Sequence, residues 1–192
     1  MAFSPWGLGR RSVLLGGVAL AVASCNAGRD LQALPAYQPQ TYRLGPGDQL
    51  RVLTFGEDQL TGEFRVDDQG QIAMPLIGNV TAAGRSPKEL ESEIARALLR
   101  GDYLKNPHVT VEVIAYRPIF VLGEVAKPGQ YPYQPGMTFL TAVAIAGGFT
   151  YRGVQDYGEV VRTNKGVAIS GRVSQNSFLA PGDVVRVLER YF

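Results

Sequence analysis

Three features of this 192-residue chain carry side chains suited to chemistry: a single cysteine, a single histidine and one pair of adjacent aspartates. Cys25 supplies a thiol, whose thiolate form is a strong nucleophile. His108 has no second cysteine to activate and no partner at the spacing of a zinc site. Asp67 and Asp68 offer two carboxyl groups, as glycosidases do, but adjacent aspartates are also ordinary turn formers. We therefore expect no catalytic site, no metal and no cofactor, and we predict modification at Cys25.

Cys25 stands at the end of a segment with the parts of a secretory signal peptide. Arg10 and Arg11 give a positive start, residues 13–23 are all small or apolar, and small residues lead into the cysteine. This run covers only about half of a ~30 Å hydrocarbon core, because each helical residue rises about 1.5 Å. We therefore interpret residues 1–24 as a signal peptide. The arginine pair also partly resembles a twin-arginine signal, so two export routes stay open.

The segment resembles the lipobox of bacterial lipoproteins. That resemblance implies that the Cys25 thiol is acylated, that the chain is cut before it, and that Cys25 becomes the lipidated N-terminus. Asn26 follows, and the absence of aspartate there resembles lipoproteins that are passed on to the outer membrane. We therefore expect a lipid anchor in the outer membrane, with the protein facing the periplasm. The alternative is a secretory signal with an incidental cysteine after it.

Loss of the predicted signal peptide leaves a chain without excess charge. The whole sequence has 19 Lys and Arg against 17 Asp and Glu, and removal of Arg10 and Arg11 makes the two numbers equal. A neutral chain gives no argument for nucleic-acid binding, which needs a basic face. The absence of a second cysteine excludes an internal disulfide framework. Residues 25–41 read as the lipidated N-terminus and a flexible tether, because they are polar or small and have no apolar period.

Residues 42–115 are predicted to form the first of two small α+β units. A Gly-Pro-Gly-Asp turn at residues 45–48 precedes a strand of period two at residues 50–55. We expect this strand to be covered on both faces. The other expected elements are a hairpin of residues 64–66 and 71–74, an extended piece at 75–80, a helix that begins after Ser86 and ends before Gly101, and a strand at 109–115.

Residues 117–192 are predicted to form the second α+β unit, because a motif of the first unit recurs there. Pro-Gly-Asp, two residues and then Arg-Val-Leu occurs at residues 46–53 and again at residues 181–188. This repeat suggests two related units, each with one helix packed on a small sheet. The expected elements are strands at 119–125, 159–162 and 184–188, and a short apolar helix at 138–146 that ends at Gly147 and Gly148.

These residues resemble a known family. Residues 42–115 look like the N-terminal domain of bacterial outer-membrane polysaccharide export proteins, and the next stretch resembles the soluble ligand-binding β-grasp domain of that family. The motifs that carry the resemblance are Leu-Gly-Pro-Gly-Asp at 44–48, Asp-Asp-Gln-Gly at 67–70, Met-Pro-Leu-Ile-Gly at 74–78, Asn-Pro-His-Val at 106–109, Val-Leu-Gly-Glu-Val at 121–125, Pro-Gly-Gln-Tyr at 128–131 and Ala-Gly-Gly at 146–148.

The resemblance implies a role in exopolysaccharide or capsule export. Longer members of the family carry a second β-grasp domain and a C-terminal helix that crosses the outer membrane in a ring-shaped pore. This sequence ends at Phe192, after its last predicted strand. We therefore expect it to act with a separate outer-membrane pore and with an inner-membrane polymer exporter or chain-length-control protein.

Candidate contact residues follow from turn chemistry and from the resemblance. The turns around Gly123, Glu124, Lys127 and Gln130 are the predicted contacts to other subunits or partners. Tyr131, Tyr133 and Tyr151 are candidate contacts to a glycan, because flat rings are suited to sugar faces. Each ring has a competing role, since aromatic side chains also dominate the burial of small cores.

The sequence is compatible with two classes of function. The first is a non-enzymatic transport component, namely a lipid-anchored, homo-oligomeric collar or conduit for a polysaccharide. The second is a monomeric glycan- or envelope-binding lipoprotein with no transport role. The measured mass of the protein in detergent distinguishes them, because a collar must be oligomeric.

Overall fold

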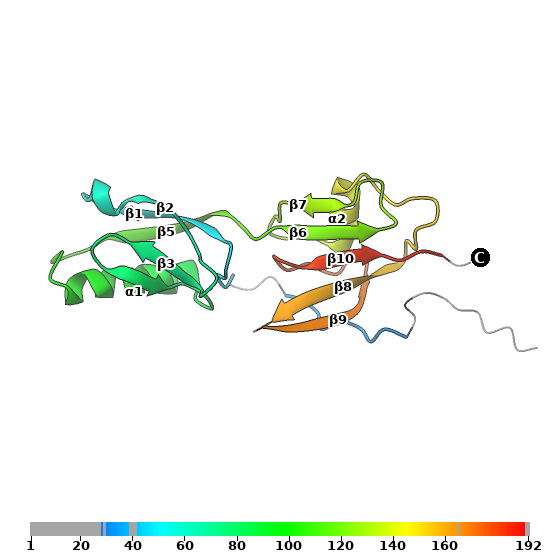
Figure 1. Ribbon diagram of the computed structural model, residues 1–192, viewed down its shortest axis with the longest axis horizontal. Coiled ribbons are helices and arrows are strands. Elements are labelled where there is room, and N and C mark those ends of the chain that lie inside the picture. The colour runs from blue at the N-terminus through cyan, green and yellow to red at the C-terminus, as the bar shows by residue number, and fades with distance from the viewer. Residues whose placement is uncertain (1–27, 29, 39–41, 165, 191–192) are drawn as a thin grey trace, which may run out of the picture.

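The computed structural model describes residues 28, 30–38, 42–164 and 166–190. The predicted signal peptide and Cys25 lie outside these residues. The described residues form α-helices and β-strands in two groups, which lie side by side along the long axis of the molecule and are joined by an extended segment at residues 116–118 (Figure 1). The predicted α+β class is confirmed. No helix within the described ranges is long and apolar enough to cross a membrane.

The N-terminal half is built around a three-stranded antiparallel sheet. Strand β1 (Gln49–Thr54) lies between β2 (Gly62–Arg65) and β5 (Val109–Ala115). A separate two-stranded sheet is formed by β3 (Gln71–Met74) and β4 (Gly78–Thr81), and a short 3₁₀ helix, η1 (Asp58–Leu60), follows β1.

Helix α1 (Pro87–Arg100) covers one face of this half. Its first turn has the predicted capping box: the Glu89 amide donates to the Ser86 hydroxyl, and the Ser86 amide donates to the Glu89 carboxylate. Leu90, Ile94 and Leu98 are fully buried on the side of the helix that enters the core. Their spacing of four residues places them in one stripe, as the sequence pattern predicts.

Two predictions for the N-terminal half are wrong. Strand β1 is covered on one face only: Leu50 and Val52 are buried, whereas Arg51 is exposed and Leu53 is 40% exposed, because α1 and the β3–β4 sheet pack on the same side. The predicted hairpin of residues 64–66 and 71–74 does not form either. Strand β2 pairs with β1 and β3 pairs with β4, so the turn at residues 67–70 passes the chain from one sheet to the other.

The C-terminal half has a five-stranded mixed sheet. Its strands, in spatial order, are β7 (Gly129–Tyr131), β6 (Ile119–Gly123), β10 (Val184–Val187), β8 (Tyr157–Asn164) and β9 (Val167–Ser174). Only the central pair, β6 and β10, is parallel among the described strands. The sequence pattern predicted β6, β8 and β10 but not β7 or β9, because polar residues and glycine interrupt the alternation in these two strands.

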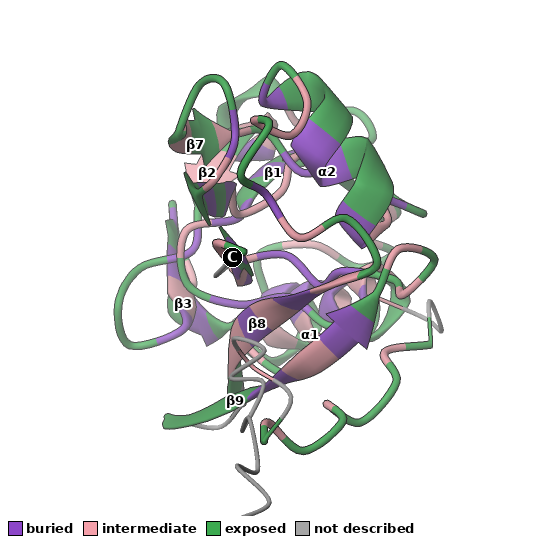
Figure 2. Cartoon of the chain, turned by 90° about the vertical axis from the view of Figure 1, so that its right-hand side faces the viewer, coloured by how far each residue is buried: buried purple, intermediate pink, exposed green. Residues whose placement is uncertain are grey.

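Helix α2 (Phe139–Ile145) packs on one face of this sheet. Phe139, Ala142 and Val143 are buried against strand residues such as Val121 and Val185, whereas the outer side of α2 is exposed (Figure 2). The far end of β9 extends beyond this cover, and residues 167–170 are exposed. The sheet therefore has a covered central part and a less protected β8–β9 end.

Candidate functional site

The loop that follows β6 holds two predicted contact residues in structural roles. Gly123 has φ +85°, and a Cβ atom on it would lie 2.1 Å from the Val187 carbonyl oxygen, so only glycine fits. The Glu124 amide donates to that same carbonyl at 3.1 Å, and its half-buried carboxylate accepts a hydrogen bond from the Thr150 hydroxyl at 2.5 Å. Both residues therefore fix the end of β6 against the rest of the C-terminal half.

The other two predicted contact residues are on the surface. Lys127 uses its backbone, with its amide donating to Ala146 and its carbonyl accepting from the Tyr131 hydroxyl, while its side chain is exposed. Gln130 is exposed on β7, at one edge of the five-stranded sheet. These two side chains are accessible to another subunit or partner, and the predicted contact remains a prediction.

The three candidate glycan tyrosines lie in different environments. Tyr131 is half-buried, and its hydroxyl donates to the Lys127 carbonyl. Tyr133 is only 7% exposed and belongs to the C-terminal core, and burial raises the pKa of its hydroxyl to about 12. Tyr151 is 86% exposed. Packing is therefore the role that the structure favours for Tyr133, and Tyr151 presents the most accessible ring of the three.

The two halves meet at a hydrogen-bonded aromatic cluster. The buried Asp48 carboxylate accepts from the Tyr42 hydroxyl at 2.7 Å and from the Arg117 amide at 3.1 Å. The Tyr116 ring lies edge-on to Tyr42, with centroids 4.9 Å apart, and edge-on to Tyr133 at 5.7 Å. Burial, together with the neighbouring Asp48 carboxylate, raises the pKa of Tyr42. This cluster connects the cores of the two halves directly.

A second buried aspartate lies in the C-terminal half. Asp183 forms a two-point ion pair with Arg162, with Nε to Oδ1 at 2.9 Å and Nη2 to Oδ2 at 2.7 Å. The Tyr37 ring lies 5.2 Å from the Arg162 guanidinium carbon, a cation–π contact. The sequence pattern did not predict this group. Pro-Gly-Asp indicated only a turn at Asp183, and Tyr37 lies in the segment that was predicted to be a tether.

The remaining residues considered for chemistry have structural roles or stand apart. One Asp67 carboxylate oxygen accepts from the amides of Gln69 at 3.0 Å and Gln71 at 2.7 Å, which is the geometry of a turn former. His108 is exposed just before β5, and its carbonyl accepts from the Phe55 amide. No group of three His, Cys, Asp or Glu residues in the described part of the chain is arranged to hold a metal ion.

Two family models match the chain in sequence order. The model described as polysaccharide biosynthesis/export protein matches residues 36–114, which include β1 to α1 and most of β5. The model described as an SLBB domain matches residues 118–175, which include β6 to β9.

Three relatives with established names cover much of the chain. It is 35% identical over 119 residues to exopolysaccharide production protein ExoF of Rhizobium meliloti, covering 56% of the chain and 28% of the relative. It is 33% identical over 165 residues to EPS I polysaccharide export outer membrane protein EpsA of Ralstonia nicotianae, covering 80% of the chain and 42% of the relative. It is 29% identical over 169 residues to polysialic acid transport protein KpsD of Escherichia coli, covering 82% of the chain and 30% of the relative.

The chain therefore spans less than half the length of each of these curated relatives. Both of its halves are nevertheless accounted for, because one family model falls on each hydrophobic core. The chain belongs to the polysaccharide biosynthesis/export protein family.

Proposed function

We propose that this protein is a lipid-anchored component of an exopolysaccharide or capsule export apparatus at the outer membrane, facing the periplasm. The observation that carries the proposal is the match of the export and SLBB models, in this order, across residues 36–175. The relatives EpsA and KpsD are named for polysaccharide export at the outer membrane and for polysialic acid transport. In this proposal the protein moves or guides a polymer and does not cleave it.

The lipid anchor is the part of the proposal that rests on Cys25. The cysteine lies outside the described residues, so the lipid anchor is supported by the sequence alone. That sequence has a charged start, a short apolar run and small residues before the only cysteine. An acyl chain on Cys25 would hold the folded body at the membrane, although no described helix is suited to span it.

We further propose that the protein works as a homo-oligomeric collar or conduit. The described sheets end in edge strands, with β7 at one edge of the five-stranded sheet and β2 and β5 at the two edges of the three-stranded one. Neighbouring subunits can cover such edges in a closed assembly. Phe120 and Leu122 on β6 are 40% and 44% exposed, and they offer apolar surface beside Gln130 on β7.

The partners in this proposal follow from the path of the polymer. A collar in the periplasm has to receive the polysaccharide from an inner-membrane exporter or chain-length-control protein and deliver it to a separate outer-membrane pore. The accessible side chains of Lys127 and Gln130 are our proposed contacts to a neighbouring subunit or to these partners.

The mass of the full chain in detergent tests the collar. We expect sedimentation at micromolar concentration to give a mass several times that of the 20.8 kDa chain. Reversal of a charge at the contact, in Lys127→Glu, is expected to weaken the assembly, whereas Lys105→Glu, at an exposed site in the other half, is the matched control. A strictly monomeric protein, or one that cleaves glycans, contradicts the proposal and favours a binding lipoprotein.

A further inference from the structure

Residues 32–38, called here the strap, are packed against the C-terminal half although the sequence predicted a flexible tether. Ala33 forms a parallel bridge with Arg172 on β9. The Arg172 amide donates to the Gln32 carbonyl at 2.8 Å, and the Leu34 amide donates to the Arg172 carbonyl at 2.9 Å. The strap therefore continues the five-stranded sheet for a short distance beyond β9.

A glycine in β9 makes this close approach possible. A Cβ atom on Gly171 would lie 2.8 Å from the N, Cα and Cβ atoms of Leu34, so any larger residue at position 171 would collide with the strap. Leu34 itself packs against the C-terminal core. The strap is thus part of the folded half. It lies over the end of strands β8 and β9 that α2 does not cover.

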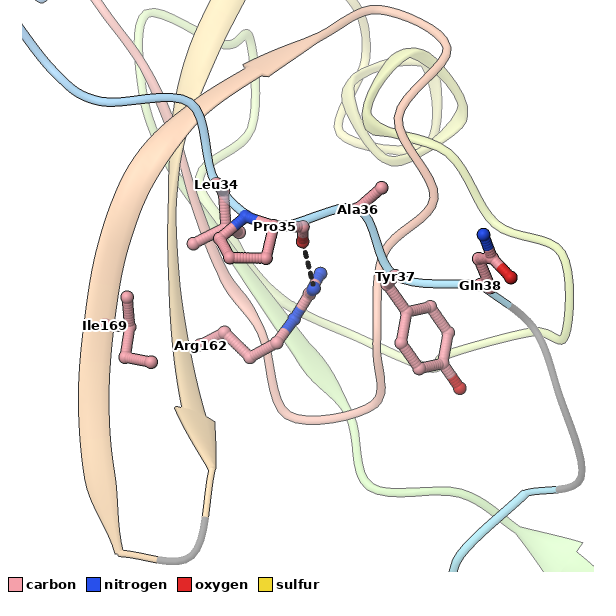
Figure 3. Close-up of a pocket in the computed structure, with 7 residues that line it drawn as sticks. All are labelled: Leu34, Pro35, Ala36, Tyr37, Gln38, Arg162 and Ile169. Atoms are coloured by element: carbon pink, nitrogen blue, oxygen red, sulfur yellow. Dashed lines mark hydrogen bonds between the residues drawn. The ribbon is translucent and has the colours of Figure 1, made fainter.

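A pocket of about 410 Å³ lies between the strap and this end of the sheet (Figure 3). Its lining is Leu34, Pro35, Ala36, Tyr37, Gln38, Arg162 and Ile169. Arg162 on β8 is paired with Ile169 on β9, so the two side chains lie on the same face of the sheet. The volume lies within the range typical of small-molecule sites.

The pocket combines apolar walls with a charged hydrogen-bond donor, Arg162, whose charge Asp183 already compensates. Leu34, Pro35 and Ile169 supply aliphatic surface, and Tyr37 supplies a half-buried aromatic ring. Arg162 gives Nε and Nη2 to the Asp183 carboxylate, while its Nη1 makes only a long 3.4 Å contact to the Pro35 carbonyl. Nη1 is therefore able to donate to a ligand, but the ion pair leaves little net charge to attract an anion.

We propose that this pocket binds an uncharged pyranose unit of a polysaccharide, an inference whose choice of ligand class rests on the proposed function. The C–H face of a pyranose ring is apolar and packs against Tyr37, Pro35 and Ile169, which removes their surface from water. A sugar hydroxyl accepts a hydrogen bond from Arg162 Nη1. Carboxylated sugars are disfavoured, because Asp183 already neutralises the guanidinium group.

The test is binding of defined oligosaccharides to the full chain in detergent. The probes are neutral pentasaccharides of glucose, galactose and mannose, with a galacturonic acid pentasaccharide as the charged comparison, followed by calorimetry and by saturation-transfer NMR. We expect saturable binding of at least one neutral probe, and weaker binding of the charged one. The proposal is overturned if no neutral probe binds saturably, or if the charged probe binds more tightly.

Two pairs of variants locate the binding site. Ile169→Trp fills the pocket and is expected to weaken binding at least about tenfold, whereas Ala168→Trp adds the same side chain to the opposite face of β9 and leaves the affinity within about twofold. Tyr37→Ala removes the ring and is expected to act like Ile169→Trp, whereas Tyr37→Phe keeps it and retains binding. Equal effects within either pair place the sugar elsewhere and contradict the proposal.

Export is measured separately in cells that produce Ile169→Trp or Ala168→Trp. If the purified protein fails to bind the probes while the gene remains necessary for surface polysaccharide, the pocket proposal fails and the export function stands. If the gene is unnecessary for surface polysaccharide but Ile169→Trp selectively loses sugar binding, the export function fails and the pocket proposal stands.

Discussion

Asp48 and Asp183 make the same hydrogen bond in two copies of one turn. Each carboxylate accepts from the backbone amide three residues earlier, Gly45 in the first copy and Ala180 in the second, at 2.8 Å. Both aspartates are buried, and each lies beside an arginine from another element. The repeated Pro-Gly-Asp motif therefore places one buried carboxylate in each half of the molecule.

Removal of the Asp183 carboxylate is expected to be strongly destabilising. Asp183→Ala leaves the guanidinium group of Arg162, whose side chain is 17% exposed, without its partner, and it also leaves the Ala180 amide unpaired. Breaking a buried ion pair by removal of one partner costs about 3–5 kcal/mol. Urea unfolding, monitored by circular dichroism, measures the loss.

Glu159→Ala is the control for Asp183→Ala, because it removes an ion pair from a neighbouring position of the same sheet. Glu159 lies 3.7 Å from Arg186, whose side chain is 64% exposed. Such a pair contributes about 0–1 kcal/mol. Equal losses in the two variants would show that the two-point geometry at Asp183 has no special effect on stability.

Gly123→Ala is expected to destabilise the C-terminal half more than Gly136→Ala does. Both glycines have φ near +85°, so alanine costs about 1–2 kcal/mol at either site. A Cβ atom at position 123 also collides with the Val187 carbonyl, whereas nothing lies within 4 Å of one at position 136. The collision adds about 1–3 kcal/mol, measurable as a lower midpoint of urea unfolding. A similar midpoint in both variants would rule the collision out.

Stability is expected to fall as the pH rises from 10 to 12. Burial is the largest cause that raises the pKa of Tyr133 to about 12, from an ordinary value near 10, so the folded protein holds this proton more tightly than the unfolded chain. The stabilisation that this tighter proton binding at Tyr133 gives the folded state is complete below pH 10 and is lost as the pH approaches the folded-state pKa. Urea unfolding at stepped pH should show a shallower decline in Tyr133→Phe, and an unchanged slope would contradict the assignment.

Anchoring is expected to depend on the Cys25 thiol. Cys25→Ser removes the acylation nucleophile, so the variant should remain uncleaved or appear in the soluble fraction. Mass spectrometry of the wild-type N-terminus should show a lipid on Cys25 and no residues from 1–24. A mature N-terminus without lipid would leave Cys25 as an incidental residue.

Periodicity and capping predicted much of the fold. Helix α1 was located at its first residue, because Ser86, Pro87 and Glu89 act locally and need no information about distant strands. The pairing of the strands was harder to predict from the sequence. The turn at residues 67–70 was read correctly as a turn, but the partners of β2 and β3 are chosen by packing between segments far apart in sequence.

Local sequence patterns did not predict the packing of the strap or the Arg162–Asp183 ion pair. Two prolines and small polar residues are typical of a linker, and nothing near Leu34 indicates that it will meet Gly171, more than a hundred residues later. Asp183 was recognisable as a turn residue, but its arginine comes from another strand. Long-range pairs of this kind depend on the assembled sheet.

Deletion of the gene, with measurement of polysaccharide on the cell surface, tests the export function. Surface polysaccharide is expected to fall sharply while the enzymes of polymer synthesis remain active, and a copy encoding the full chain is expected to restore it. Normal surface polysaccharide in the deletion strain would contradict a role in export.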